Sequence, residues 1–372
     1  VTAERYRAMK VTIAAYLYPG WHQCPEREKG FPSGWSEWDL VYNAHPRFQG
    51  HRQPNLPMQG RYDDSRPATA ESQIRLARAH GVDLFVHAFF WSRGKRVLGA
   101  ALDRGFLGSA AGECFPFALM WANRMPRGVL PVKNAGGPLI DPIRLVHTDP
   151  EDFLTLIRYI AERYFCRDNY FHLNGAPYLS IFDTSFFLRQ LGAELARQAV
   201  SAARKWLRDQ GYGGLHLAAI DPAERFCADL KQIGFDSVTH YLLLPEWKGP
   251  EQQDYLQRAR RCSQKWPLFP RRTGLPYFPS VSPGWDATPR AAVFGKGAKR
   301  RYPWSPVVTG SCPERFHLAL GEAAAYARQA ERDPLLFIAS WNEWSEGHYL
   351  EPDQRFGHGW LQAVRQVARE AE

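Results

Sequence analysis

Features that mark several large classes of proteins are missing from this sequence of 372 residues. No apolar run is long enough to cross a membrane, so no membrane span is predicted. No signal peptide is visible in the first ten residues, and neither a short repeat nor a low-complexity linker divides the chain. We therefore expect a single folded domain over residues 1–372.

Cysteine is scarce and never clustered. The six cysteines are far apart in the sequence, and no two form a Cys-x-x-Cys pair. A disulfide framework is not expected in a chain of this length, so reduced thiols and a cytoplasmic setting are favoured. A signal peptide removed upstream of residue 1 would make the periplasm the alternative.

Motifs for several kinds of chemistry are also missing. The turn at residues 18–22 reads Tyr-Pro-Gly-Trp-His, which is not the Gly-rich phosphate loop of a dinucleotide-binding fold. No Gly-x-Ser-x-Gly elbow is present, which argues against a serine nucleophile. There is no His-x-His or His-Glu-x-x-His spacing either. We therefore expect neither a cofactor nor a resident metal ion.

The charge is basic but scattered. Formal net charge is +9, and the one dense run holds Lys296, Lys299, Arg300 and Arg301, which we interpret as a solvated loop. No zinc-finger, helix-turn-helix or RNA-binding signature accompanies the charge, so no nucleic-acid partner is predicted. A basic surface can also attract an acidic polysaccharide, and the sequence leaves that possibility open.

Short apolar runs alternate with amphipathic stretches eight times along the chain. Near-continuous apolar runs are typical of strands buried on both faces. We predict strands at 11–18, 82–89, 116–121, 177–182, 215–220, 237–241, 277–281 and 335–340. Eight strands that alternate with helices predict an α/β fold, a closed (β/α)₈ TIM barrel, with a doubly wound open sheet as the alternative.

Helices are predicted at 71–80, 151–165, 186–209, 223–233, 252–263 and 313–332. Thr69 is a candidate cap for the first, and Ser311 and Glu314 have capping-box spacing at the last. Residues 21–66 are long, aromatic and rich in Pro and Gly. We expect them to form an ordered loop insertion after the first strand, over the C-terminal face of the barrel.

Polar side chains follow most of the predicted strands, where active sites of barrels lie. His87, Asn123, Asp183, Asp221 and His240 are among them. Each also has an ordinary explanation, because a histidine can be buried in the core and Asp183 or Asp221 can cap the helix that follows. The whole series is more informative than any single member.

The strongest local signal is the segment from Ser340 to Asp353. It places Glu343 and Glu346 three residues apart directly after the last predicted strand, between aromatic residues. In a helical turn the two side chains face the same way, and neighbouring Trp rings raise a carboxyl pKa by desolvation. Cleavage of a glycosidic bond needs one protonated and one ionised carboxyl group, so we predict this pair as the catalytic acid/base machinery.

Five longer segments carry a family resemblance. They are Gly34-Trp35-Ser36-Glu37-Trp38, residues 46–54, Gly284-Trp285-Asp286-Ala287-Thr288-Pro289-Arg290, Trp341-Asn342-Glu343-Trp344-Ser345-Glu346-Gly347 and Leu350-Glu351-Pro352-Asp353. With them the chain resembles the WbsX-type, family-99-like glycoside hydrolases over nearly its whole length. Two segments depart from that pattern, Arg124-Met125-Pro126 and His87-Ala88-Phe89-Phe90-Trp91.

The resemblance implies a (β/α)₈ barrel that acts on polysaccharide. By similarity to the family 99 endo-mannosidases it also implies hydrolysis with net retention. Glu343 would then act as a base on the 2-hydroxyl of the substrate, giving a 1,2-anhydro-sugar intermediate. Glu346 would protonate the leaving oxygen and afterwards activate water.

We therefore predict a retaining, endo-acting glycoside hydrolase whose partner is a bacterial polysaccharide or oligosaccharide. The predicted substrate-binding residues are His87, Trp91, Asn123, Asp183, His240, Tyr241, Trp285, Asp286, Asn342, Trp344, His348, Tyr349 and Glu351. One alternative is a glycosyltransferase of surface polysaccharide (O-antigen or capsule) biosynthesis, although no Asp-x-Asp motif is present. The other is a polysaccharide-binding barrel without catalysis.

Overall fold

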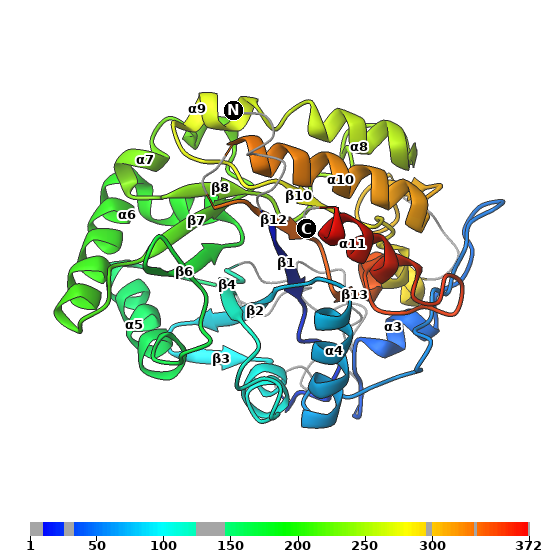
Figure 1. Ribbon diagram of the computed structural model, residues 1–372, viewed down its shortest axis with the longest axis horizontal. Helices are drawn as coiled ribbons and strands as arrows, with labels where there is room; N and C mark the ends of the chain where they lie inside the picture. The colour runs from blue at the N-terminus through cyan, green and yellow to red at the C-terminus, as the bar shows by residue number, and fades with distance from the viewer. Residues whose placement is uncertain (1–9, 26–32, 124–145, 295–299, 331–332, 371–372) are drawn as a thin grey trace.

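A ring of eight parallel strands forms the centre of the molecule (Figure 1). The structure, a computed structural model, describes residues 10–25, 33–123, 146–294, 300–330 and 333–370. The strands are β1 (Thr12–Leu17), β2 (Leu84–Ser92), β4 (Phe117–Trp121), β6 (Ala176–Ile181), β7 (His216–Ile220), β8 (Ser237–Thr239), β10 (Ser280–Val281) and β12 (Leu335–Ile338). Each lies within or beside one of the eight predicted runs, so the predicted strands are confirmed.

The ring closes between β8 and β10. The other neighbours follow the order β10-β12-β1-β2-β4-β6-β7-β8. The last pair meets through a parallel bridge between Val238 and Tyr277. There the amide of Val238 donates to Pro276 at 2.8 Å, and the amide of Phe278 donates to Val238 at 3.0 Å. The predicted TIM barrel is confirmed, and the open sheet is excluded.

Side chains on each strand alternate between the inside and the outside of the barrel. Along β2, Val86 belongs to an inner cluster with Tyr16 and Met120. Phe85 and Phe89 of the same strand belong to the larger cluster between the strands and the helices. Both faces are apolar, which explains why the strands read as continuous runs rather than alternating ones.

The helices surround the sheet on all sides in Figure 1. They are α4 (Pro67–Ala79), α5 (Pro150–Ile160), α6 (Thr184–Asp209), α7 (Leu230–Ile233), α8 (Tyr255–Ser263), α9 (Leu268–Thr273), α10 (Pro313–Ala330) and α11 (Gly359–Arg369). Shorter helical pieces are η1 (Ala101–Phe106), η3 (Ala161–Phe165) and η4 (Glu224–Phe226). Helix α11 was not predicted; it buries Leu361 and Val364 in the outer cluster.

Several predicted helix boundaries were wrong. Helix α4 begins at Pro67, four residues early, because proline fits the first turn, and Arg66 rather than Thr69 is the N-cap residue. Residues 252–254 form β9 (Gln252–Asp254), which pairs with β11 (Val307–Thr309). The predicted capping box does not form through Ser311, whose Oγ has no hydrogen-bond partner among the described residues.

The long segment after β1 packs as an aromatic layer. It includes α3 (Trp38–Tyr42), and the rings of Trp21 and Trp38 lie 4.1 Å apart between centroids. The indole N–H of Trp38 donates to the carbonyl of Tyr62 at 2.7 Å. Its ring also lies 6.4 Å from that of Trp344, beyond the end of β12. The described part of the segment therefore lies over the C-terminal face, as predicted.

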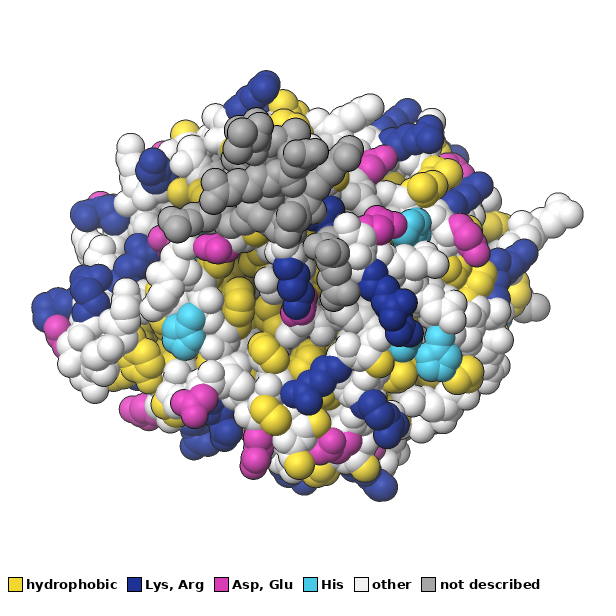
Figure 2. Space-filling view, viewed as in Figure 1, with side chains coloured by type: hydrophobic (Ala, Val, Ile, Leu, Met, Phe, Trp, Pro, Cys, Tyr) yellow, Lys and Arg dark blue, Asp and Glu magenta, His cyan; other side chains and the backbone are white. Residues whose placement is uncertain are grey.

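The surface carries its positive charge in dispersed form. Figure 2 shows a face that is hollowed near its centre, with hydrophobic side chains in the hollow and Lys and Arg spread around it. Of the predicted basic run, Arg300 pairs with Glu251 at 2.5 Å, whereas Lys296 and Lys299 lie outside the described residues. None of the described helices has the length and apolar character that membrane crossing needs.

Candidate active site

A tight turn after β12 brings Glu343 and Glu346 to the same side of the chain. The turn consists of β13 (Asn342–Glu343), η6 (Trp344–Glu346) and β14 (His348–Tyr349). Gly347 ends the short helical turn with a φ of 67°, a conformation that favours glycine. The amide of Glu343 donates to Ser340 Oγ at 2.9 Å, which holds the start of the turn.

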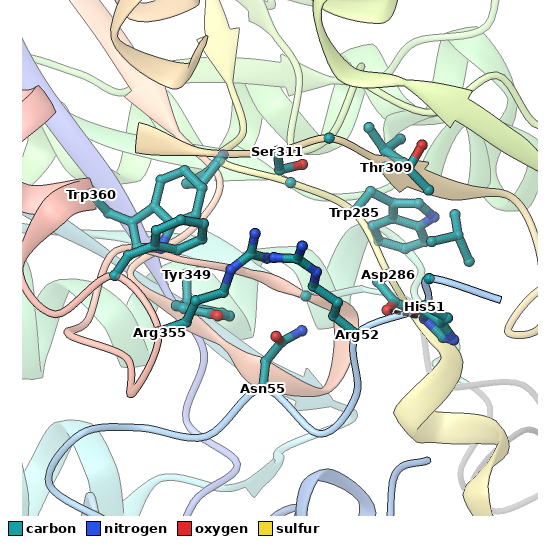
Figure 3. A pocket seen from close by; sticks show the side chains of 18 residues that line it. His51, Arg52, Asn55, Trp285, Asp286, Thr309, Ser311, Tyr349, Arg355 and Trp360 are labelled. Atoms are coloured by element: carbon teal, nitrogen blue, oxygen red, sulfur yellow. Dashed lines mark hydrogen bonds and ion pairs between the residues drawn. The ribbon is translucent and has the colours of Figure 1, made fainter. Parts of the chain in front are cut away.

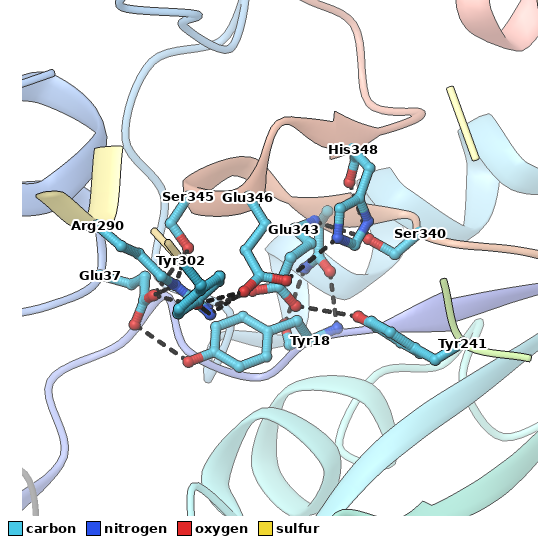
Figure 4. A network of polar contacts seen from close by, with 11 residues as sticks. Tyr18, Glu37, Tyr241, Arg290, Tyr302, Ser340, Glu343, Ser345, Glu346 and His348 are labelled. Carbon is cyan, nitrogen blue, oxygen red and sulfur yellow. Dashed lines mark hydrogen bonds and ion pairs between the residues drawn. The ribbon is translucent and has the colours of Figure 1, made fainter. Parts of the chain in front are cut away.

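Both glutamates contact one arginine, Arg290 of η5 (Thr288–Phe294) (Figure 4). Its Nη2 lies 2.7 Å from Glu343 Oε1, and its Nη1 contacts Glu346 Oε1. Nη1 also donates to the hydroxyl of Tyr302 at 2.8 Å, and Tyr302 donates to Glu346 at 2.6 Å. The two carboxylates are therefore bridged by a single guanidinium group.

A third carboxylate, Glu37, lies on the same guanidinium. Glu37 Oε1 is 3.0 Å from Arg290 Nη2 and accepts from Ser345 Oγ at 2.8 Å. Its other oxygen accepts from the Tyr18 hydroxyl at 3.1 Å. Glu37 is fully buried. It comes from the long segment after β1, so this segment supplies part of the charge cluster itself.

The charges of this cluster do not balance if every group is ionised. Three carboxylates face one guanidinium, so repulsion favours at least one bound proton. Burial raises the pKa of Glu343 well above its ordinary value against the opposing charge of Arg290, and the charges of Glu346 and Glu37 raise it further. Burial acts on Glu346 too, but Arg290 and His348 overcome it and lower the pKa of Glu346. The surroundings thus shift the pKa values of the two carboxyl groups in opposite directions.

Three of the predicted substrate-binding residues lie beside the pair. The Tyr241 hydroxyl donates to Glu343 Oε2 at 3.1 Å. His348 Nε2 lies 3.4 Å from Glu346 Oε2. Trp285 stacks on the His348 ring with centroids 5.8 Å apart. Glu346 keeps 13% of its side chain exposed, whereas Glu343 keeps 4%, so the pair is reached from the Glu346 side.

Other predicted binding residues support the turn from behind. Glu351 accepts hydrogen bonds from Tyr62, Gln73, Trp341 and Trp344. The side chain of Asn342 accepts a hydrogen bond from the amide of Tyr18 at 2.8 Å and donates one to the carbonyl of Tyr18 at 3.0 Å. The ring of Tyr349 stacks on Trp344 at 3.7 Å. These side chains position the turn, and their polar atoms form hydrogen bonds with other groups of the protein.

Three more of the predicted substrate-binding residues also form supporting contacts within the protein, at other places on the C-terminal face of the barrel. The side chain of Asn123 donates to the carbonyl of Asp183 and accepts from its amide, which links the ends of β4 and β6. Asp183 caps α6 through the amide of Phe186 at 2.7 Å. Asp286 accepts from His51, Gln53 and Thr288. Capping was the ordinary alternative for Asp183, and the structure shows it.

His87, Trp91 and His240 are not brought to the site. His87 packs outward between Phe85, Phe106 and Phe117, and burial lowers its pKa to about 3. Trp91 lies 4.9 Å from the ring of Tyr159 in α5. His240 contacts Phe269 and Tyr277 outside the barrel. The structure does not bring these three side chains to the glutamate pair, because the sequence did not reveal which face of the strand each side chain occupies.

The described residues contain no group of three His, Cys, Asp or Glu side chains arranged to hold a metal ion. The three carboxylates that do converge hold Arg290 between them.

A family model described as "Glycosyltransferase WbsX" matches residues 12–364. The chain belongs to this family. Two relatives, each called "Uncharacterized protein WxcX" and each from a strain of Xanthomonas campestris pv. campestris, are 30% identical over 98% of the chain. The WbsX-family chain spans about half of their length, 50% of each relative.

Solved structures share the barrel. The GH99 endo-alpha-mannosidase from Bacteroides thetaiotaomicron matches with a TM-score of 0.59 at 16% identity, covering 97% of both chains. A "Glycoside hydrolase-like protein" matches with a TM-score of 0.57 at 15% identity, covering 96% of this chain and 94% of the other. At such identities the likeness establishes the fold.

Sequence reasoning missed the residues that complete the charge cluster in this WbsX-family member. Arg290, Glu37 and Tyr302 were not proposed as site residues. Arg290 and Glu37 do lie in segments that carried the family resemblance. The predicted pair of buried glutamates was itself a usable signal, because two buried carboxylates require a cation such as an arginine nearby.

Proposed function

We propose that this chain is a retaining, endo-acting glycoside hydrolase that cleaves a bacterial polysaccharide or oligosaccharide with Glu343 and Glu346. One observation carries the proposal: two carboxyl groups at the end of the eighth barrel strand contact the same guanidinium group, in surroundings that shift their pKa values in opposite directions. A glycosidase needs such a pair, because the leaving oxygen must be protonated while the anomeric carbon is attacked. The barrel shared with a GH99 enzyme supports it.

The roles follow the family resemblance. Glu343 acts as the base on the 2-hydroxyl of the substrate, and a raised pKa makes an ionised carboxylate a stronger base. Glu346 acts as the acid on the leaving oxygen and is the more exposed of the two. In the free chain Arg290 keeps Glu346 ionised. Both roles therefore require that bound substrate weakens this contact and that a proton passes from Glu343 to Glu346.

The test compares Glu346→Gln and Glu343→Gln on two kinds of substrate. Both variants should lower polysaccharide cleavage, measured as new reducing ends, by about 10²–10⁴-fold. An aryl glycoside with a good leaving group needs no acid, so it should restore turnover in Glu346→Gln but not in Glu343→Gln. Rescue of Glu343→Gln alone would reverse the two roles.

Glu314→Gln is the matched control, because this carboxyl group is exposed in the first turn of α10 and is not among the carboxylates that contact Arg290. It should retain normal turnover. If Glu346→Gln and Glu343→Gln both cleave polysaccharide as well as the control, the catalytic pair is refuted. Binding without cleavage by the unaltered chain, across a broad glycan panel, would favour a non-catalytic barrel.

A second candidate is a glycosyltransferase of surface polysaccharide biosynthesis, which the description of the family favours. The same carboxyl pair would then activate an acceptor hydroxyl. Incubation with nucleotide sugars separates the two functions. Sugar transfer from a nucleotide donor, with no cleavage of polysaccharide, would support the transferase and refute the hydrolase.

A further inference from the structure

A pocket lies beside the acidic cluster without containing any of its carboxylates. It has a volume of about 280 Å³ and is lined by residues of the long segment after β1, of the 283–286 and 307–311 segments, and of the chain between Gly347 and Trp360. Trp285 belongs to its wall. The same indole stacks on His348, which contacts Glu346. One aromatic ring therefore separates this pocket from the catalytic pair.

Two arginines face this pocket, and neither forms an ion pair with a described carboxylate. Figure 3 shows the side chains of Arg52 and Arg355 pointing toward each other across it. Neither guanidinium forms an ion pair or a hydrogen bond with another described residue; Arg355 only lies over the Phe356 ring at 4.2 Å. Burial and the charge of Arg52 both lower the pKa of Arg355. Such a pair of like charges is stabilised by an anion between them.

The nearby carboxylates are used in other contacts. Asp286 lines the pocket, but its oxygens accept from His51, Gln53 and Thr288. Asp353 accepts at one oxygen from the amides of Arg355 and Phe356, and at the other from Tyr349 and Trp360. Neither carboxylate forms an ion pair with Arg52 or Arg355, although the charge of Asp353 partly offsets that of Arg355.

The rest of the lining suits a sugar. The wall includes the rings of Trp285, Tyr349 and Trp360, each at most 6% exposed, so that C–H groups of a sugar would meet apolar atoms there. Ser311 supplies a hydroxyl whose oxygen has no partner among the described residues, and it lies two residues before the start of α10. The positive end of that helix adds to the field of the arginines.

We propose that this pocket binds a sugar residue that carries a negatively charged group, such as the carboxylate of a uronic acid, between Arg52 and Arg355. The substrate class of the enzyme would then be an acidic polysaccharide. That last step rests on the proposed function, whereas the ligand chemistry of the pocket does not.

The experiment measures binding to the whole chain by calorimetry with three probes: glucuronate, glucose and inorganic sulfate. Glucuronate should bind at least about tenfold more tightly than glucose, because charge-assisted hydrogen bonds to the arginines are lost with the neutral sugar. Arg52→Gln and Arg355→Gln should each abolish that preference. Arg208→Gln, an exposed arginine on α6, removes the same charge and should preserve it.

Each result decides between binding models. Equal binding of glucuronate and glucose, or no binding of either, refutes the pocket. Binding of sulfate without glucuronate shows a site for a free anion and refutes the sugar assignment. A preference that survives in both arginine variants places the ligand elsewhere. Glu346→Gln should still bind glucuronate, so a failure of catalysis and a failure of the pocket are distinguishable.

Discussion

Among single residues, Arg290 determines the charge balance of the site. It is the cation shared by Glu37, Glu343 and Glu346, all of them largely removed from solvent. Removal of one member of a buried charge network leaves the others uncompensated, which costs about 3–5 kcal/mol of unfolding free energy. We expect Arg290→Gln to lose about that much stability in urea unfolding at pH 8.

The loss should be smaller at pH 5. Without Arg290 the pKa values of Glu343 and Glu346 both rise, so the folded variant binds more protons than its unfolded form across this range. Stability then falls as pH rises. Arg208→Gln serves as the control and should change stability by less than about 0.5 kcal/mol at either pH. A deficit for Arg290→Gln that does not depend on pH would contradict this charge model.

Glu351 makes a second prediction at this scale. It accepts four hydrogen bonds from neutral donors, and burial raises its pKa to about 7, against about 4.3 in an unfolded chain. A raised acidic pKa stabilises the fold fully below the unfolded value and loses that contribution as pH rises toward 7 and beyond. The difference amounts to about 3 kcal/mol between pH 4 and pH 8.

Glu351→Gln removes this ionisation. Urea unfolding of the variant at several pH values should show a decline in stability between pH 5 and pH 8 that is smaller than that of the unaltered chain. The comparison concerns the slope and not the absolute stability, because the new amide also changes the hydrogen bond to Trp344. Identical slopes for the two proteins would show that Glu351 stays ionised throughout.

The residues of the candidate site were predictable to different degrees. Glu343, Glu346 and Tyr241 were identified because they follow buried strands, and the structure brings them together. His87 and His240 follow the same rule and lie outside the barrel. Position along a strand indicates the end at which a side chain lies, but a shift of one residue changes its face. Arg290 was missed because its partners are distant in sequence.

At the scale of elements, the turn between β13 and β14 fixes the geometry of the pair. Gly347 has a positive φ, and an added Cβ would lie 2.8 Å from the Asp286 amide nitrogen. That nitrogen donates to the carbonyl of Glu346 at 2.8 Å. We expect Gly347→Ala to cost about 2–4 kcal/mol and to lower turnover, because the backbone under Glu346 must move.

Gly357 offers a matched comparison for this substitution. It also has a positive φ, but an added Cβ would meet nothing within 4 Å. Gly357→Ala should therefore cost only about 1 kcal/mol, the strain of the left-handed conformation alone. Thermal unfolding and turnover of both variants check the prediction. Equal effects of the two substitutions would show that the contact with Asp286 does not position Glu346.

Strands and helices differed in how well the sequence predicted them. The eight barrel strands are buried on both faces, so each appears as a distinct apolar run. Helix ends depend on contacts that the local sequence does not contain. Residues 252–254 were assigned to a helix because they precede one, yet they pair with 307–309, more than fifty positions away. The start of α4 was predicted four residues late because Thr69 suggested a cap.

For the molecule as a whole, the dispersed charge and the arginine pocket make different contributions to the binding of an acidic glycan. The net charge of +9 attracts an anionic chain from a distance, which affects the rate of association and weakens as salt rises. Direct contacts with Arg52 and Arg355 act after arrival and affect the rate of dissociation. The two contributions can therefore be separated kinetically.

Surface plasmon resonance with an immobilised uronic-acid polysaccharide tests this separation. Arg52→Gln and Arg208→Gln each change the net charge by one, so both should keep the decrease of association rate with salt. Only Arg52→Gln should raise the dissociation rate, by about tenfold if it loses one charge-assisted hydrogen bond. Equal dissociation rates for the two variants would mean that the glycan is held by the general field of the molecule and that the pocket has no part in its retention.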